Sequence, residues 1–153
     1  SERYVGAVIA RAAPGRPWAR LPRALANEQD LYLLAADRHA DLGFVARLRR
    51  GPWGWVDIAR RQDGKLDLQG WAASLDDGDV ARIEIIVDGE SCQAVTGVAR
   101  PDVAQVLEDP RAANSGWSLR LPAADAVDVE VSAVEVSAVH HAGTVGLLFA
   151  GRV

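Results

Sequence analysis

The chain has 153 residues, enough for one ordinary domain or two very small ones. Its hydrophobic fraction of 49% and charged fraction of 25% are those of a soluble globular protein, and they exclude a disordered or fibrous one. The formal net charge of -4 argues against a nucleic-acid partner, and the single cysteine, Cys92, excludes an intramolecular disulfide and a cysteine-based zinc cluster.

The sequence predicts no membrane span, because none of its apolar runs approaches the length of a membrane-spanning helix. The first residues, SERYVGAVIARAAPG, have too short an apolar core for a secretory signal peptide. Together with the single cysteine, this favours the cytoplasm as the compartment.

The first third of the chain has the least regular pattern. Residues 4–12 (YVGAVIARA) predict a strand. Further on, Asn27 stands in a capping position ahead of an apolar helical face, which favours a short helix. A strand over residues 30–36 (DLYLLAA) is the alternative.

Residues 43–50 (GFVARLRR) and 53–61 (WGWVDIARR) predict two strands around a turn at Gly51-Pro52. Five arginines fall between positions 47 and 61. We interpret them as a solvated strand face rather than a phosphate-binding groove.

The clearest pattern begins at Lys65. Residues 65–75 alternate leucines with polar residues before Gly70-Trp71, which predicts a strand with one buried face. The cluster DDGD at 76–79 predicts a turn. In residues 81–95, Asp88-Gly89 separates two strand-like runs, and this pair is preferred in type I′ hairpins because both residues take positive φ.

Residues 101–110 change to helical spacing between two prolines, which predicts one short helical turn. Residues 114–122 (NSGWSLRLP) then predict a strand with Trp117 on its apolar side. Residues 143–151 predict a last strand, which is either buried on both faces or capped at a sheet edge.

Between these segments, residues 129–138 repeat VEVSA twice and lead into His140-His141. An odd-numbered repeat cannot keep its valines on one face of a strand, so we expect a bulge or turn near Ala133-Val134 to reset the phase. The histidine pair then marks the exit of the strand into the turn at Ala142-Gly143.

A weak internal similarity bears on domain organisation. Residues 42–50 and 115–123 share a glycine, an aromatic residue and a following leucine, and each lies after an arginine- and proline-containing stretch. We therefore divide the chain into residues 1–60, an N-terminal extension or truncated first copy of a β-sandwich, and residues 61–153, a complete sandwich.

The second part carries a family resemblance. The pattern GWA, VDG, RPD, SGW and LP resembles a bacterial immunoglobulin-like β-sandwich module, which is often appended to glycosyltransferases, methyltransferases and other surface-polysaccharide or secreted proteins. The matching residues are Gly70, Trp71, Ala72, Val87, Asp88, Gly89, Arg100, Pro101, Asp102, Gly116, Trp117, Leu121 and Pro122. The resemblance implies a mainly β, immunoglobulin-like sandwich with one or two short helices. It implies no catalytic residues, since none are assigned to that module.

The residues themselves also argue against catalysis. The chain has no Gly-x-Ser-x-Gly elbow and no glycine-rich phosphate loop, so we expect no enzyme activity and no cofactor. His140-His141 is the best metal candidate, but adjacent residues on a strand point to opposite faces, so we expect no metal site.

Tryptophans provide the candidate binding residues. Trp53 and Trp55 lie two apart on one predicted strand face, and Trp18 follows Pro17 in a predicted loop. They indicate a non-catalytic module that binds another protein or its own subunits, or alternatively a carbohydrate-binding module that stacks a glycan on these rings. Packing within the sandwich is the competing interpretation of the same residues.

Overall fold

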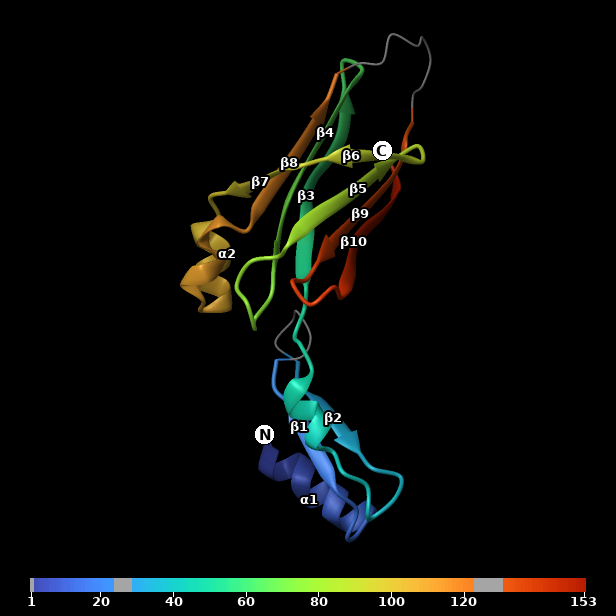
Figure 1. Ribbon diagram of the computed structural model, residues 1–153, viewed down its shortest axis with the longest axis vertical. Helices are drawn as coiled ribbons and strands as arrows, with labels where there is room; N and C mark the ends of the chain where they lie inside the picture. Colours follow the sequence, from blue (N-terminus) through green and yellow to red (C-terminus); the bar gives the residue numbers. More distant parts are fainter. Residues whose placement is uncertain (1, 24–28, 123–130) are drawn as a thin grey trace. The chain divides into compact units, whose positions relative to one another are not determined.

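The computed structural model describes residues 2–23, 29–122 and 131–153, which form two compact units (Figure 1). Unit 1 lies within Ser1–Arg50 and unit 2 within Gly51–Val153. A boundary at residue 60, suggested by the sequence, would cut the strand β3 (Trp53–Gln62). The units divide before this strand because residues 43–47 form a 3-10 helix in unit 1 rather than its hairpin partner.

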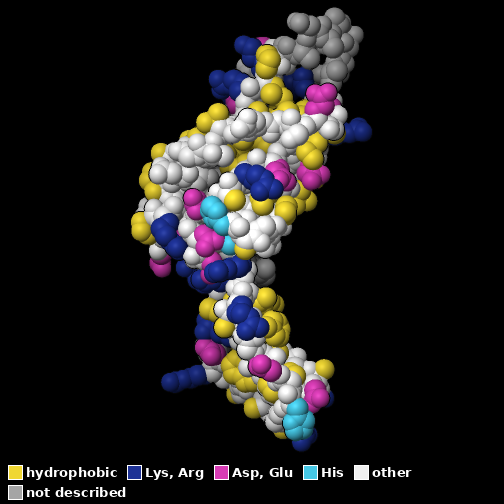
Figure 2. Space-filling view, viewed as in Figure 1, with side chains coloured by type: hydrophobic (Ala, Val, Ile, Leu, Met, Phe, Trp, Pro, Cys, Tyr) yellow, Lys and Arg dark blue, Asp and Glu magenta, His cyan; other side chains and the backbone are white. Residues whose placement is uncertain are grey.

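Unit 1 contains α1 (Glu2–Ala12), β1 (Trp18–Leu21), β2 (Leu31–Leu34) and the 3-10 helix η1 (Gly43–Arg47). β1 and β2 pair antiparallel. Of the described apolar residues in this unit, only Ala35 and Val45 are buried, whereas Tyr4 is 71% exposed. Figure 2 shows many apolar side chains on the surface of this unit. Its core is therefore small for its length.

Several sequence-based expectations for unit 1 are wrong. Residues 4–12 belong to a helix, although valine and isoleucine favour strands. Val5 and Ile9, four residues apart, lie on its half-buried face, whereas Tyr4 and Val8 are exposed. The favoured helix near residue 31 is instead β2, so the strand alternative is correct. The expected cap Asn27 lies outside the described residues.

Unit 2 contains two four-stranded antiparallel sheets. Sheet I has the order β3, β4 (Lys65–Ala73), β8 (Gly116–Leu121), β7 (Val95–Val98). Sheet II has the order β10 (Val145–Arg152), β9 (Ala133–Val139), β5 (Arg82–Val87), β6 (Glu90–Gln93). Seven of these eight strands lie in segments for which the sequence predicts strands; β7 starts at the end of the predicted hairpin.

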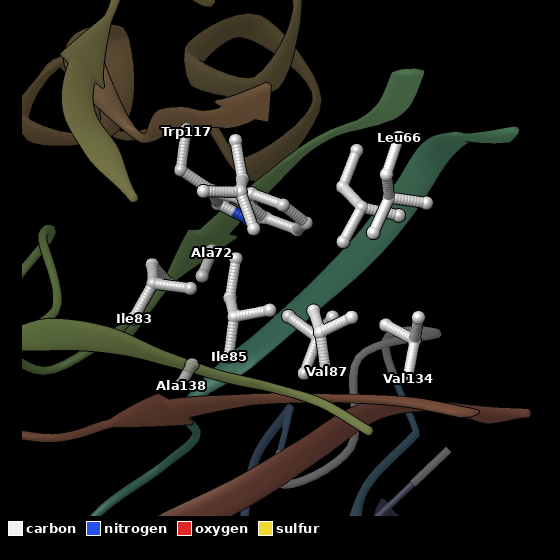
Figure 3. Close-up of a cluster of buried hydrophobic side chains, with 11 residues drawn as sticks. Leu66, Ala72, Ile83, Ile85, Val87, Trp117, Val134 and Ala138 are labelled. Atoms are coloured by element: carbon white, nitrogen blue, oxygen red, sulfur yellow. The ribbon is translucent and has the colours of Figure 1, made fainter. Parts of the chain in front are cut away.

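The main apolar core lies between the two sheets (Figure 3). Leu68 of β4 and Trp117 of β8 come from sheet I, and Ile85 of β5 and Val136 of β9 come from sheet II; each is at most 1% exposed. Side chains from both sheets share one cluster, so unit 2 is a β-sandwich. The expected mainly β fold with short helices is confirmed.

A second, smaller cluster lies on the outer face of sheet I. The helix α2 (Pro101–Leu107) and the 3-10 helix η2 (Pro110–Asn114) contribute Val103, Leu107 and Ala112 to it. Trp53 of β3 and Trp71 of β4 pack against these side chains. The short helical segment that the sequence predicts at 101–110 therefore covers part of one sheet.

The Asp88-Gly89 hairpin has the expected geometry. β5 and β6 pair with Val87 opposite Glu90, which leaves a two-residue loop. Asp88 has a φ of 51° and Gly89 a φ of 87°, the two positive values that a type I′ turn needs. The side chain of Asp88 also accepts a hydrogen bond from the backbone N–H of Ala133, at 2.8 Å, and this bond lowers the pKa of the carboxyl group.

β9 begins at Ala133, where we expected the phase of the repeat to reset. From there Val134, Val136 and Ala138 alternate into the core. The valines at 127 and 129 lie outside the described residues, so the upstream half of this expectation stays a prediction. β10 is an edge strand rather than one buried on both faces, since Val145 and Leu147 are about three-fifths exposed.

Candidate functional site

Trp18 belongs to unit 1, where it packs rather than lying in a loop. It is the first residue of β1, and its ring centroid lies 6.2 Å from that of Tyr32 on β2. A Cβ atom on Gly6 of α1 would lie only 3.1 Å from the same ring. Trp18 therefore joins the helix to the β1–β2 hairpin within unit 1.

Trp53 and Trp55 share the outer face of β3, but their environments differ. Trp53 is half-buried against the α2 and η2 cluster. Trp55 is 65% exposed. It pairs directly across the sheet with Trp71, which is itself half-buried in that cluster. Trp55 is thus the exposed end of an otherwise packed row of aromatic side chains.

A cluster of polar side chains begins two residues after Trp55, at Asp57. Asp57 occupies a β-bulge in β3, and its carboxylate receives a hydrogen bond of 2.6 Å from Nη1 of Arg100. Arg100 also donates a hydrogen bond of 2.7 Å to Asp102, and this pairing lowers the pKa of Asp102 to about 2. A hollow of about 190 Å³ lies at this ion pair, and its lining includes Asp57, Gln69, Arg100 and Trp117 but not Trp55. We call Trp55, Asp57, Gln69 and Arg100 the Trp55 surface.

The edges of the sandwich are protected against pairing with further strands. β3 and β10 lie against each other: a Cβ atom on Gly146 would be 2.5 Å from the carbonyl oxygen of Pro52. β6 has only four residues, and β7 contains a bulge at Gly97. Short strands, bulges and covering contacts are the usual devices against edge-to-edge association. Exposed side chains, rather than open backbone edges, are therefore the available binding groups.

His140 is buried, and both of its ring nitrogens contact other groups of unit 2. It directly follows β9 and is 1% exposed. Its Nε2 lies 2.7 Å from Asp77 Oδ2 and 3.0 Å from Ser74 Oγ. Its Nδ1 accepts a hydrogen bond from the backbone N–H of Ala142, at 3.0 Å. Since Nδ1 accepts, the proton of the neutral ring is on Nε2, which donates toward the loop at 74–79.

This serine, histidine and aspartate set does not have the geometry of a hydrolase triad. In such a triad the serine and the carboxylate contact different ring nitrogens. Here both contact Nε2, and Ser74 is 1% exposed. The arrangement instead fastens the 74–79 loop to the end of β9. No sequence motif links Ser74 to residues so distant, so sequence reasoning missed it.

His141 points to a different partner from His140. Its Nε2 lies 3.0 Å from Asp79 Oδ1 at the surface. Among residues 2–23, 29–122 and 131–153, no group of three or more histidine, cysteine or acidic side chains converges as a metal site. Within those same ranges, no helix has the length and hydropathy needed to cross a membrane.

Comparisons with known proteins give no family assignment. No family model, no curated protein and no solved structure matches this chain.

Proposed function

We propose that the chain is a non-catalytic binding and assembly module, and that the Trp55 surface is its protein-binding face. The observation that carries the proposal is Trp55, which is 65% exposed on β3 and has half-buried Trp71 directly opposite it on β4. Tryptophan is enriched among the residues that dominate binding energy in protein interfaces, and such residues are commonly ringed by polar groups.

A second copy of the chain is the partner that the charges favour. The outer face of sheet I carries both signs, with Asp57 held by Arg100 and Asp67 flanked by Arg60 and Arg120. A twofold-symmetric contact that sets a cation of one copy against an anion of the other forms that pair twice, so a surface that carries both signs has the groups for such a contact. This surface therefore suits homodimerisation.

The strand order of unit 2 supports the accessory-module interpretation. In chain order, sheet I corresponds to strands A, B, E and D of an immunoglobulin sandwich, and sheet II to G, F, C and C′. This correspondence accords with the immunoglobulin-like module that the GWA, VDG and RPD motifs resemble. It bears on the fold of the proposed module, whereas the function depends on the Trp55 surface.

The experiment is light scattering over a dilution series, with Trp55→Ala compared with Val106→Ala. Val106 is 70% exposed on α2 and provides an apolar control of similar exposure. We expect the wild type and Val106→Ala to have a mass above the monomer at high concentration, and Trp55→Ala to be monomeric. A wild type that is monomeric at every concentration contradicts self-assembly.

Carbohydrate binding is the second candidate, and the hollow lined by Asp57, Gln69 and Arg100 favours it. An exposed indole ring next to hydrogen-bonding groups such as Asp57 and Gln69 can stack one sugar and orient its hydroxyls. On a glycan array, binding that is lost in both Trp55→Ala and Gln69→Ala supports this function. Glycan binding that survives both changes excludes this surface as the glycan site.

A further inference from the structure

The two units differ in formal charge. Residues 1–50 contain nine arginines and five acidic residues, which gives unit 1 a formal charge of +4. Residues 51–153 contain eight basic and sixteen acidic residues, which gives unit 2 a formal charge of -8. A charge asymmetry of this kind indicates a partner that attracts one part of the chain and repels the other, such as a nucleic acid or a membrane surface.

One face of the helix α1 lies against the β1–β2 hairpin. Val5 and Ile9 are half-buried on this face. Glu2 is the only acidic residue of the helix, and its carboxylate lies 2.6 Å from Nη1 of Arg20 on β1. The one negative charge of α1 is therefore neutralised on the side of the hairpin.

The opposite face of α1 is exposed and combines basic with apolar side chains. Arg3, Ala7 and Arg11 follow one another at intervals of four residues, so they form one row along the helix. Tyr4 and Val8 form the neighbouring row and are 71% and 48% exposed. We call these five residues the α1 outer face.

The arginines of the α1 outer face carry uncompensated charge. Neither the Arg3 nor the Arg11 guanidinium has an ion-pair partner in the part of the chain that the structure describes. The α1 outer face contains no acidic residue. Its charge is therefore free to attract an anionic surface.

The side chains of the α1 outer face favour a lipid surface over a protein or a nucleic acid. Protein interfaces centre on large anchors that fill pockets, whereas this face has only one large side chain, Tyr4, beside small alanine and valine. Tyrosine is enriched at the membrane–water interface, and arginine extends its charged head toward the phosphates while its methylene groups stay in apolar surroundings. Helices that bind anionic membrane surfaces combine basic residues with an apolar, aromatic-containing face in this way.

We propose that the α1 outer face binds the surface of a lipid bilayer that contains anionic lipids. The helix lies parallel to the bilayer, with Tyr4 and Val8 at the boundary between headgroups and acyl chains. Arg3 and Arg11 contact the anionic groups of the lipids. Unit 2 stays in the water, because its formal charge of -8 is repelled by the same surface.

The test is cosedimentation of the full chain with lipid vesicles. The vesicles consist of phosphatidylcholine alone or of phosphatidylcholine mixed with phosphatidylglycerol. We expect binding to the mixed vesicles only, and weaker binding at high salt, because salt screens the attraction between exposed charges. Absence of binding to the mixed vesicles at low salt overturns the proposal, and so does equal binding to both kinds of vesicle.

Charge variants test the two arginines. Arg3→Gln combined with Arg11→Gln should weaken binding about 30-fold, since each basic residue near an anionic surface strengthens binding about fivefold. Arg3→Lys combined with Arg11→Lys keeps the charge and should keep the binding. Lys65→Gln combined with Arg152→Gln is the matched control, because it removes the same charge from exposed positions of unit 2 and should leave binding nearly unchanged. Equal weakening by the two glutamine pairs overturns the proposal.

A further variant tests the apolar row. Tyr4→Ser should weaken binding to the mixed vesicles about tenfold, the size of one lost aromatic side chain in an apolar environment. Val106→Ser is the control, because Val106 is 70% exposed on α2 of unit 2, close to the exposure of Tyr4. Unchanged binding of Tyr4→Ser, or an equal loss in Val106→Ser, contradicts insertion of this face.

Other partners of the α1 outer face give different results. If it docks on the acidic unit 2 of a second copy, the Arg3→Gln and Arg11→Gln pair loses self-association and the mixed vesicles do not bind. If it docks on an acidic protein, polyglutamate binds and the mixed vesicles do not. Either result overturns the proposal. Trp55→Ala should bind vesicles as the wild type does, so the proposal can fail without any consequence for the Trp55 surface.

Discussion

Gly70 on β4 is required by the atoms around it and not by its backbone angles. A Cβ atom at this position would overlap the carbonyl oxygen of Trp55 and lie 2.7 Å from Cζ2 of Trp117. The absence of a side chain therefore lets β3 approach from one side and the Trp117 ring cover the strand from within the core. The sequence pattern Gly-Trp marks this position, but its physical reason is visible only with the partners in place.

We expect Gly70→Ala to destabilise the chain by about 3 kcal/mol, because the overlap involves backbone that cannot move freely. Gly89→Ala is the matched control: a Cβ atom there meets no other atom within 4 Å, so only the positive φ costs energy, about 1 kcal/mol. Urea unfolding followed by circular dichroism measures both. Equal losses would contradict the packing role of Gly70.

His140 and His141 are adjacent in sequence but differ in burial and in the number of their hydrogen-bond partners. His140 is buried with hydrogen bonds from both ring nitrogens, whereas His141 is exposed with a single partner. Adjacent identical residues cannot be ranked from sequence, because the distinction depends on which of them the 74–79 loop covers.

We expect His140→Ala to cost about 3 kcal/mol of unfolding free energy, since it leaves a cavity and removes the ring nitrogens that contact Asp77 and the backbone N–H of Ala142. His141→Ala should change stability by no more than about 0.5 kcal/mol. The comparison uses chemical unfolding of the two variants under identical conditions. If the exposed histidine proved the costlier one, the assignment of roles would be wrong.

At the scale of elements, local patterns predicted best where a local rule decides the structure. The pair Asp88-Gly89 predicted the hairpin correctly, because the geometry of a two-residue turn depends on those two residues alone. Pro101 opens α2, and Arg100 and Asp102 pair around it. The helix α1 was not predicted, because the strand propensity of its valines and isoleucine was given more weight than the helical spacing of its apolar residues. The 3-10 helix η1 was not predicted, because so short an apolar run does not distinguish the periodicity of a helix from that of a strand.

The Arg100–Asp102 ion pair should make the stability of the folded chain depend on pH. Arg100 lowers the pKa of Asp102 to about 2 in the folded chain, so the folded state favours the ionised carboxylate. The stabilisation is present above the ordinary pKa near 3.8 and is lost as pH falls toward 2. We expect the stability difference between wild type and Asp102→Asn to shrink over this window.

Unfolding free energies at several pH values between about 5 and 2 test this expectation, with Asp63→Asn in the β3–β4 turn as the control. A difference that stays constant through the window would mean that Asp102 stabilises the fold without its charge.

At the scale of the whole molecule, the two units differ in how many buried apolar residues they contain. Both apolar clusters of unit 2 consist of its own residues. Among the described residues of unit 1, Ala35 and Val45 are the only buried apolar ones. Unit 2 therefore has what an independently folding domain needs, and unit 1 has little of it.

We expect a fragment of residues 51–153 to unfold cooperatively within about 3 °C of the corresponding transition of the full chain, a difference below about 1 kcal/mol. A fragment of residues 1–50 should show no cooperative transition. Differential scanning calorimetry measures both. A fragment 51–153 that is unfolded would show that the core of unit 2 is insufficient by itself.

The candidate site was predictable only in part. The sequence indicates that Trp53 and Trp55 share a strand face, and they do. It could not show that α2, nearly fifty residues later, covers Trp53 and leaves Trp55 open. Nor could it place Asp57 beside Arg100, because that contact depends on a bulge in β3. Burial and long-range pairing, rather than residue type, separate the binding candidate from the packing residue.

The most direct test of the central claim is amide hydrogen exchange at concentrations above and below the association midpoint. If the Trp55 surface joins two copies of the chain, the peptide covering residues 53–58 exchanges more slowly at the high concentration, and Trp55→Ala abolishes the difference. Identical exchange of this peptide at both concentrations, or concentration-dependent protection confined to other segments, would contradict the claim.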